Sequence, residues 1–146
     1  MASSQREFSS NPFDDDKLRE ECGVFGFYGH SDASAHVALG LHALQHRGRE
    51  AAGIVSFDGV HFHSHRSLGS VGDHFSSANV IDQLSGASAI GHVRYSTTGE
   101  TVIRNVQPLF ADLAGGGLAI AHNGNITNAT QLRHRLEKRG SIFQST

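Results

Sequence analysis

The stretch "EECGVFGFYG", residues 20–29, marks the point at which the chain changes character, and it contains the only cysteine, Cys22. The segment before it, residues 1–21, is rich in Ser, Asp and Glu, and its few apolar residues are too scattered to build a buried face. After Cys22 a short apolar run lies between two glycines, a pattern that favours a buried strand. The sequence therefore predicts a disordered leader over residues 1–21 and a folded domain that begins at Cys22.

The composition predicts a small globular domain whose partners are small molecules. A chain of 146 residues is long enough for one domain with its own core and short for two. Its 17 glycines against 2 prolines favour short strands joined by many tight turns. A formal net charge of -2 argues against the basic surface that nucleic acid or an anionic membrane would need. A single cysteine cannot form an internal disulfide, and no membrane-length apolar run or secretory signal is present, so the expected compartment is the cytoplasm.

Downstream of Cys22 the hydrophobic pattern predicts strands, tight turns and two helices. The expected elements up to residue 99 are a helix from Ser31 or Asp32 to a stop at Gly48, a hairpin that turns at Asp58 and Gly59, and a strand that runs into a polar loop within 87–99. Beyond them we expect a hairpin turn at 114–118 and a second strand that runs into a polar loop within 116–128. The last elements are a helix opened by a capping box of Asn128 and Gln131 and closed by Gly140, and the start of a strand at 141–144. Both loops follow strand ends, where active sites are commonly built.

Cys22 allows two interpretations. Free cysteines are among the most buried residue types, and most of them only pack in a core. The acidic neighbours, the end of the leader and the flexible Gly23 that follows favour a reactive thiol instead. If the chain is cut between Glu21 and Cys22, the thiol and a new α-amino group belong to one residue. Because these two kinds of group ordinarily titrate close together, the amine can take the proton of the thiol at little cost, and the nucleophile carries its own base.

The stretch "HNGN" offers donors for the oxyanion that forms when a thiolate attacks an amide carbonyl. The side-chain amide of Asn123 and the backbone N–H of Gly124 could converge on one oxygen, since glycine leaves the backbone unobstructed. An ordinary Asn-Gly turn is the competing interpretation.

Arg94 leaves a predicted strand into a small polar loop, where a guanidinium can hold a carboxylate with two parallel hydrogen bonds. A surface salt bridge explains it equally well. Three histidines alternate along "HFHSH", at His61, His63 and His65, but no carboxylate or cysteine joins them, so a solvated strand face is preferred and no metal site is predicted.

Four motifs, taken together and in this order, resemble the glutaminase domain of the amidophosphoribosyltransferase family of class II glutamine amidotransferases. They are "CGVFG" at 22–26, "LQHRGREAAGI" at 44–54, "GHVRYSTTG" at 91–99 and "AHNGNITN" at 121–128. The resemblance implies an α+β fold of the N-terminal nucleophile hydrolase type, a four-layer αββα sandwich with antiparallel sheets. It also implies the catalytic residues: Cys22 is the nucleophile, and Asn123 and Gly124 are the oxyanion donors. For substrate binding it implies that Arg94 holds the α-carboxylate of L-glutamine and that Thr97 lies in the same substrate loop. The floor of the pocket is shaped by His46, Arg47 and Gly48.

The resemblance further implies that ammonia from glutamine is passed to a phosphoribosyltransferase domain, which makes 5-phosphoribosylamine from PRPP in purine biosynthesis. Residues 1–21 resemble a self-cleaved propeptide, and residues 22–146 resemble only the N-terminal part of the domain, so this chain alone is expected to be inactive. Mg²⁺ with PRPP, an iron–sulfur cluster and a homo-oligomer are expectations for the transferase part. The alternatives are a glutaminase domain of another class II enzyme, for glucosamine phosphate, asparagine or glutamate synthesis, or an inactive partial domain.

Overall fold

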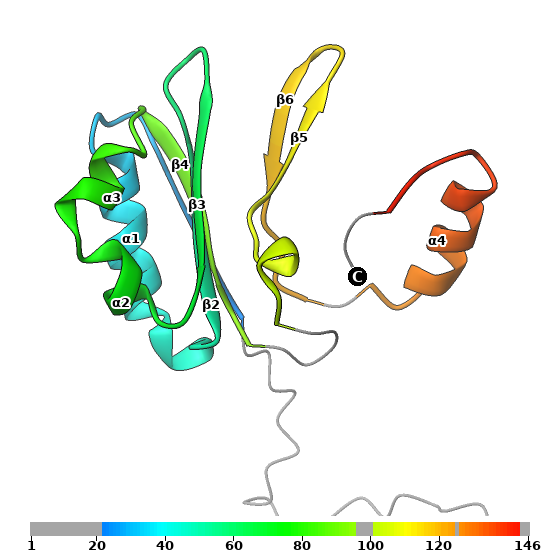
Figure 1. Cartoon of the computed structure of the whole chain (residues 1–146), viewed down its shortest axis with the longest axis horizontal. Helices are drawn as coiled ribbons and strands as arrows, with labels where there is room; N and C mark the ends of the chain where they lie inside the picture. Colours follow the sequence, from blue (N-terminus) through cyan, green and yellow to red (C-terminus); the bar gives the residue numbers. More distant parts are fainter. Residues whose placement is uncertain (1–21, 96–100, 125, 144–146) are drawn as a thin grey trace, which may run out of the picture.

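The computed structural model describes residues 22–95, 101–124 and 126–143. The proposed leader and Thr97 lie outside these residues. Within them the chain forms a layer of helices, a four-stranded sheet, a two-stranded sheet and a further helix, and Figure 1 shows these parts following one another across the molecule.

The four-stranded sheet is antiparallel throughout, with the strand order β1-β4-β2-β3. Its strands are β1 (Gly23–Tyr28), β2 (Ala51–Phe57), β3 (Phe62–Leu68) and β4 (Ser88–Arg94). The predicted hairpin is confirmed, because β2 and β3 pair along their whole length on either side of the turn at Asp58 and Gly59. The Asp58 carboxylate accepts the backbone N–H groups of Val60 and His61, which closes that turn.

Helices cover one face of this sheet and build the core. They are α1 (Ala33–Ala43), α2 (Val71–Phe75) and α3 (Ala78–Asp82). Val37 and Leu41 of α1 are fully buried, as are Ile54 and Val93 of the sheet. A Cβ at Gly91 would lie 2.6 Å from the Val37 side chain, so glycine lets α1 approach β4 closely. Burial of each large aliphatic side chain contributes roughly 1.5 to 3 kcal/mol.

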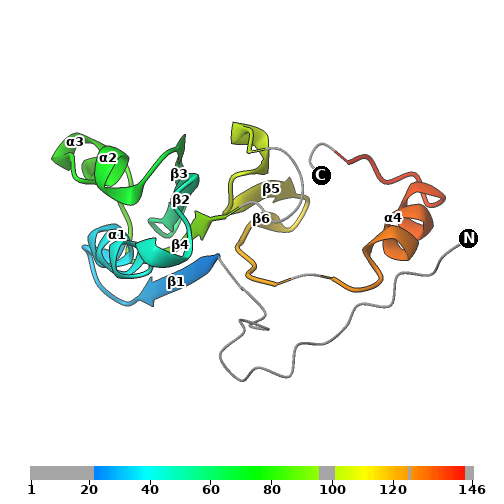
Figure 2. The same cartoon turned by 90° about the horizontal axis from the view of Figure 1, so that it is seen from below.

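The second sheet pairs β5 (Leu109–Leu113) with β6 (Gly116–Ile120). Figures 1 and 2 both show it on the side of the four-stranded sheet that faces away from α1, with α4 (Ala129–Glu137) farther out. The hairpin turn predicted at 114–118 is confirmed at 114–115, whereas 116–118 already belong to β6. The predicted α+β class with antiparallel sheets is confirmed. Two 3₁₀ turns, η1 (Gln45–Arg47) and η2 (Ile103–Asn105), precede β2 and β5.

Several sequence expectations about element ends were wrong. The first α-helix ends at Ala43, before the predicted stop at Gly48; Gly48 is instead the C-cap residue of the 3₁₀ turn η1, in an extended conformation with φ of -170°. Asn128 is the N-cap residue of α4 but makes no side-chain capping bond, so the predicted capping box does not form. Residues 141–143 belong to no strand. The expected end of α4 is confirmed, because Gly140 has a φ of 88° and its N–H donates to the carbonyl of Glu137.

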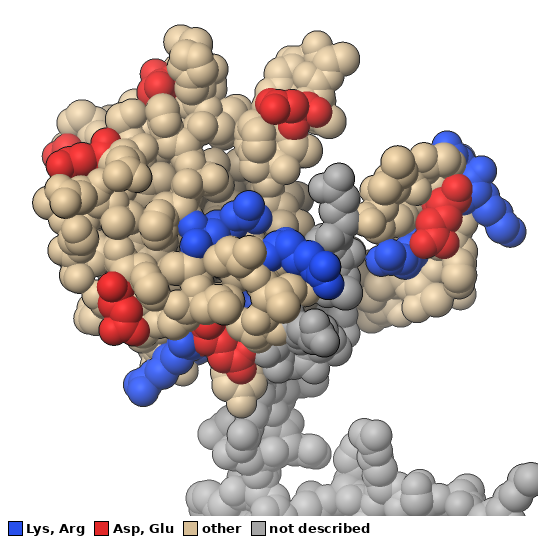
Figure 3. All heavy atoms as spheres, viewed as in Figure 1, with Lys and Arg blue, Asp and Glu red and all other residues tan. Residues whose placement is uncertain are grey.

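Charged side chains of both signs are interspersed on the face that Figure 3 shows. Among the residues that the structure describes, no helix combines the length and the apolar character needed to cross a membrane.

Candidate active site around Cys22

Cys22 lies immediately before β1 and is partly exposed. Because β1 and β4 are antiparallel, with Gly23 opposite Val93, the end of β4 lies beside the start of β1. The Cys22 thiol is 3.5 Å from the carbonyl oxygen of Tyr95, the residue that follows β4, and can donate to it. The strand register therefore brings the thiol to the loop that begins at Tyr95.

The main-chain carbonyl of Cys22 accepts two hydrogen bonds from distant parts of the sequence. Arg47 donates through Nε at 2.9 Å, and Asn123 donates through Nδ2 at 2.9 Å. A side-chain amide carries two N–H donors, so Asn123 keeps a second N–H for another acceptor. Two residues that the sequence predicted for the site are thus brought to the predicted nucleophile.

The turn that carries Arg47 packs on the main chain of Arg94. Gly48 is buried, and a Cβ there would lie 2.7 Å from the carbonyl carbon and oxygen of Arg94. Gln45 anchors the other side of the turn, since its side chain donates to Gly48 O and accepts the N–H of Val71 at 2.6 Å.

His46 lies in the same turn as Arg47. Its side chain is exposed, and Nδ1 lies 3.0 Å from the carbonyl oxygen of Ala43 at the end of α1. The ring therefore contacts the end of the preceding helix.

Arg94 ends β4, one residue before the carbonyl that faces the thiol. Its Nη1 donates to Asn105 O at 3.2 Å, and its own carbonyl accepts the N–H of Glu50 at 3.2 Å. Glu50 also accepts the Thr101 hydroxyl at 2.7 Å. Thr101 is the first described residue after the loop that contains Thr97, so Glu50 connects both ends of that loop.

Gly124 follows Asn123 in a loop after β6. Its φ of 138° is a conformation that residues with a side chain rarely adopt, which accounts for glycine here. A side chain from outside the loop holds it in place, because the N–H of His122 donates to Gln107 Oε1 at 2.6 Å. Sequence reasoning placed Asn123 and Gly124 correctly in a loop after a strand, but it missed Gln107.

His92 was also missed. It is fully buried on β4, two residues before Arg94 and therefore on the same face of the strand. Burial lowers the His92 pKa to about 4; the positive charge of Arg94 and charge on His122 also lower it, while the His122 backbone opposes them. Neither ring nitrogen makes a hydrogen bond of good geometry within the described residues. The alternation of His92 and Arg94 in "GHVR" is the signal that could have placed it near the site.

The three alternating histidines do not form a common site. His63 Nε2 lies 2.8 Å from the Asp58 carboxylate, whereas the His65 ring contacts the edge of Phe75. Within the described ranges, no group of three or more His, Cys, Asp or Glu side chains is arranged to hold a metal ion.

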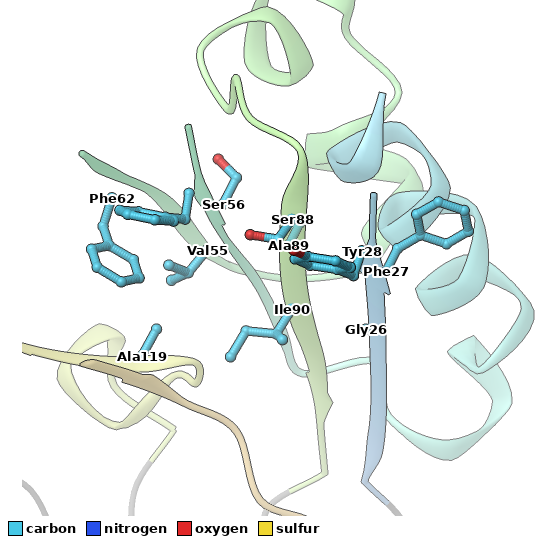
Figure 4. Close-up of a pocket in the computed structure, with 11 residues that line it drawn as sticks. Gly26, Phe27, Tyr28, Val55, Ser56, Phe62, Ser88, Ala89, Ile90 and Ala119 are labelled. Carbon is cyan, nitrogen blue, oxygen red and sulfur yellow. The ribbon is translucent and has the colours of Figure 1, made fainter. Parts of the chain in front are cut away.

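A hollow of about 380 Å³ lies elsewhere between the sheets, lined by apolar residues such as Val55, Phe62, Ile90 and Ala119 (Figure 4). Its lining comes from the end of β1 at Tyr28 and the start of β4 at Ser88, which is the opposite end of both strands from Cys22. None of the predicted site residues lines it.

The chain belongs to the class II glutamine amidotransferases. The family model of these enzymes matches residues 22–141, which start at Cys22 and include every site residue discussed above. The sequence resemblance to this family is therefore confirmed.

Within the family, the chain is similar to amidophosphoribosyltransferases. It is 60% identical over 138 residues to the enzyme of Rhizobium etli, an alignment that covers 94% of this chain and 28% of the relative. It is 50% identical over 130 residues to that of Bacillus subtilis, covering 88% of this chain and 27% of the relative. The chain also superposes on the solved structure of glutamine phosphoribosylpyrophosphate amidotransferase from B. subtilis, complexed with ADP and GMP, with a TM-score of 0.76. The two sequences are 47% identical, and the superposition covers 84% of this chain and 26% of that one. The chain thus spans about a quarter of the length of these relatives, and its fold is that of their N-terminal nucleophile glutaminase domain.

Proposed function

We propose that this chain supplies the nucleophile, Cys22, and the oxyanion donors with which the full-length protein hydrolyses the side-chain amide of L-glutamine. The observation that carries the proposal is the convergence on Cys22: Arg47 Nε and Asn123 Nδ2 both lie 2.9 Å from its carbonyl oxygen, and its thiol lies beside the end of β4. Membership of the glutamine amidotransferases supports glutamine as the substrate.

The reaction begins when the Cys22 thiolate attacks the carboxamide carbon and forms a carbon–sulfur bond. The negative charge moves to the carboxamide oxygen, where the second N–H of Asn123 and the backbone N–H of Gly124 stabilise it. The carbon–nitrogen bond then breaks as the protonated α-amine of Cys22 gives the proton it took from the thiol to the leaving nitrogen, and ammonia departs. Water then hydrolyses the γ-glutamyl thioester to glutamate and restores the thiol. The α-amine of Cys22 is the proposed base, which requires that residues 1–21 be removed as a propeptide.

Arg94 is the proposed anchor for the α-carboxylate of glutamine. Its guanidinium comes from the strand end beside Cys22 and is held on one side by the Asn105 carbonyl. The planar guanidinium of arginine can donate two parallel hydrogen bonds to one carboxylate, which the ammonium of lysine cannot do. Thr97 is proposed to line the same subsite, and Arg47 and Gly48 to form its floor, whereas His46 has a contact that supports only a role in the turn.

The proposed acceptor of the ammonia is PRPP, giving 5-phosphoribosylamine, because the relatives from Rhizobium etli and Bacillus subtilis are amidophosphoribosyltransferases. This step needs a transferase domain, for which Mg²⁺ with PRPP, an iron–sulfur cluster and a homo-oligomer remain predictions. The cytoplasm remains the proposed compartment.

The test is glutamine hydrolysis by the full-length protein and its Cys22→Ala variant. We expect the variant to lose glutamine-dependent activity while synthesis from added ammonia is spared, because ammonia bypasses the thiol. N-terminal sequencing should find Cys22 as the first residue of the active protein, and a glutamine analogue with an electrophilic carbon should label it there. Hydrolysis that survives Cys22→Ala, or an active protein that still carries residues 1–21, contradicts the mechanism.

A further inference from the structure

A short segment, residues 105–107, leads from the end of η2 toward β5 over the face of the four-stranded sheet that lacks helices. Arginines from that sheet hold it by consecutive carbonyls: Arg94 Nη1 donates to Asn105 O at 3.2 Å, and Arg66 Nη1 donates to Val106 O at 3.3 Å. Asn105 and Val106 are both buried. The main chain of the segment is therefore fixed to the sheet.

Gln107 itself is fixed by close contact. A Cβ at Gly53 of β2 would clash with the carbonyl oxygen of Gln107, so the two main chains touch directly. Pro108, the next residue, is fully buried. Since its backbone cannot shift easily, Gln107 presents its side chain from a rigid base.

That side chain reaches the loop after β6. Gln107 Oε1 accepts the N–H of His122 at 2.6 Å, and His122 immediately precedes Asn123, whose amide donates to the Cys22 carbonyl. No other hydrogen bond of the His122 N–H is seen in the described part of the chain, and the next residues, Asn123 and Gly124, are the proposed oxyanion donors.

We propose that Gln107 is a positioning residue for glutamine hydrolysis, which sets the backbone of residues 122–124 so that the donors of Asn123 and Gly124 meet the oxyanion. The inference rests on the function proposed above. Oxyanion donors are effective only when they are held in place before the reaction, and a misplacement of about 1 Å can cost about a hundredfold in rate. The sheet supplies this rigidity to an exposed loop through one side-chain acceptor.

The test compares Gln107→Met, which keeps the length of the side chain and removes its acceptor, with Gln107→Glu, which keeps an acceptor oxygen. Steady-state glutamine hydrolysis is measured in the full-length protein. In Gln107→Met we expect kcat to fall roughly tenfold to a hundredfold with KM changed by less than about threefold. Gln107→Glu should recover most of the loss. Gln83→Met makes the same chemical change at an exposed residue after α3 and should leave both parameters unchanged.

Two further measurements separate positioning from general damage. Alkylation of Cys22 by iodoacetamide should proceed at the wild-type rate in Gln107→Met, because the nucleophile is intact. Hydrogen exchange of the His122 amide should become faster in that variant and stay slow in Gln107→Glu, because only the former loses the acceptor.

The outcomes decide between the two proposals. If Cys22→Ala is inactive but Gln107→Met keeps the wild-type kcat, the positioning role is wrong and the proposed function stands. If Cys22→Ala still hydrolyses glutamine, both are wrong. If Gln107→Met does not fold, Gln107→Asn takes its place, since its amide is one methylene too short to reach His122; an unchanged kcat and unchanged His122 exchange in that variant also overturn the inference.

Discussion

The burial of His92 on β4 allows a quantitative prediction of how the free energy of unfolding depends on pH. The His92 pKa is lowered to about 4 from its ordinary value of 6.5, chiefly because burial disfavours the charged ring and because Arg94 lies on the same face. The ring has no exposed surface, so solvent does not screen this effect. His92 is therefore neutral in the folded protein at neutral pH.

The sign and size follow from proton linkage. Above pH 6.5 the ring is neutral in both the folded and the unfolded chain, and this histidine gives no pH dependence. Between pH 6.5 and about 4 only the unfolded chain takes up the proton, so the free energy of unfolding falls as the pH falls. Below about pH 4 the folded protein is protonated as well, and the loss levels off. At about 1.4 kcal/mol for each pH unit, the full loss is roughly 3 kcal/mol.

The assay is urea unfolding at several pH values between 7.5 and 4, an interval that brackets this transition, for the wild-type protein and for His92→Gln. The variant cannot titrate at this position, so its free energy of unfolding should fall by roughly 3 kcal/mol less than that of the wild type over the same interval. Comparing the two slopes removes any constant cost of the substitution. It also removes the shared contributions of Asp58 and Asp73, whose lowered pKa values make them lose stabilising interactions at more acidic pH.

His42→Gln is the matched control, because His42 is an exposed histidine on α1, on the other face of the sheet. It should keep the pH dependence of the wild type. If His92→Gln has the same slope as the wild type, the buried ring does not resist protonation, and the account of its environment is refuted.

Two further predictions concern the proposed substrate contacts. Arg94→Lys should raise the glutamine KM roughly tenfold to a hundredfold, because one charge-assisted hydrogen bond to the carboxylate is lost; steady-state kinetics beside the exposed control Arg135→Lys measure this, and an unchanged KM removes the assignment. Asn123→Ala should lower kcat by roughly a hundredfold or more with little change in KM, because the amide acts mainly on the oxyanion. Asn79→Ala on α3 is the control. A wild-type kcat in Asn123→Ala would show that Asn123 is not an oxyanion donor.

The strands and their turns could be predicted because the signals are local. The apolar run after Cys22, the Asp-Gly turn and the glycine-rich turn each specify a strand or hairpin without knowledge of the rest of the fold. Helices α2 and α3 have five residues each, which is too few for a 3.6-residue period to show. Asparagine is a favoured N-cap residue, but the backbone of Asn128 has φ of -110° and ψ of 27°, and its side chain makes no hydrogen bond to the first turn of α4.

The site was predictable residue by residue but not in its contacts. The motifs pointed to Cys22, Arg47 and Asn123, yet their meeting at one carbonyl depends on the pairing of β1 with β4 and on a loop 101 residues away along the chain. Gln107 could not be found, because its acceptor contacts a backbone N–H, and any residue type supplies one. His92 required knowledge of burial, which depends on how distant segments pack against β4 rather than on the sequence near the histidine.

Glycine explains how these separate motifs come into contact. At Gly48 a Cβ would meet the main chain of Arg94 at 2.7 Å, and at Gly53 it would clash with the main-chain oxygen of Gln107. In both cases the neighbour is backbone, which cannot move aside as the end of a flexible side chain can. A side chain at Gly48 would push the end of β4 away from the turn that carries Arg47, and one at Gly53 would displace the segment that supports His122. Both displacements reach Cys22, the first through Arg47 and the second through Asn123. The glycines of "HRGREAAG" therefore serve the site as contact points between main chains, and Gly48, which the sequence predicted as the stop of the first helix, also caps the 3₁₀ turn η1 that follows that helix.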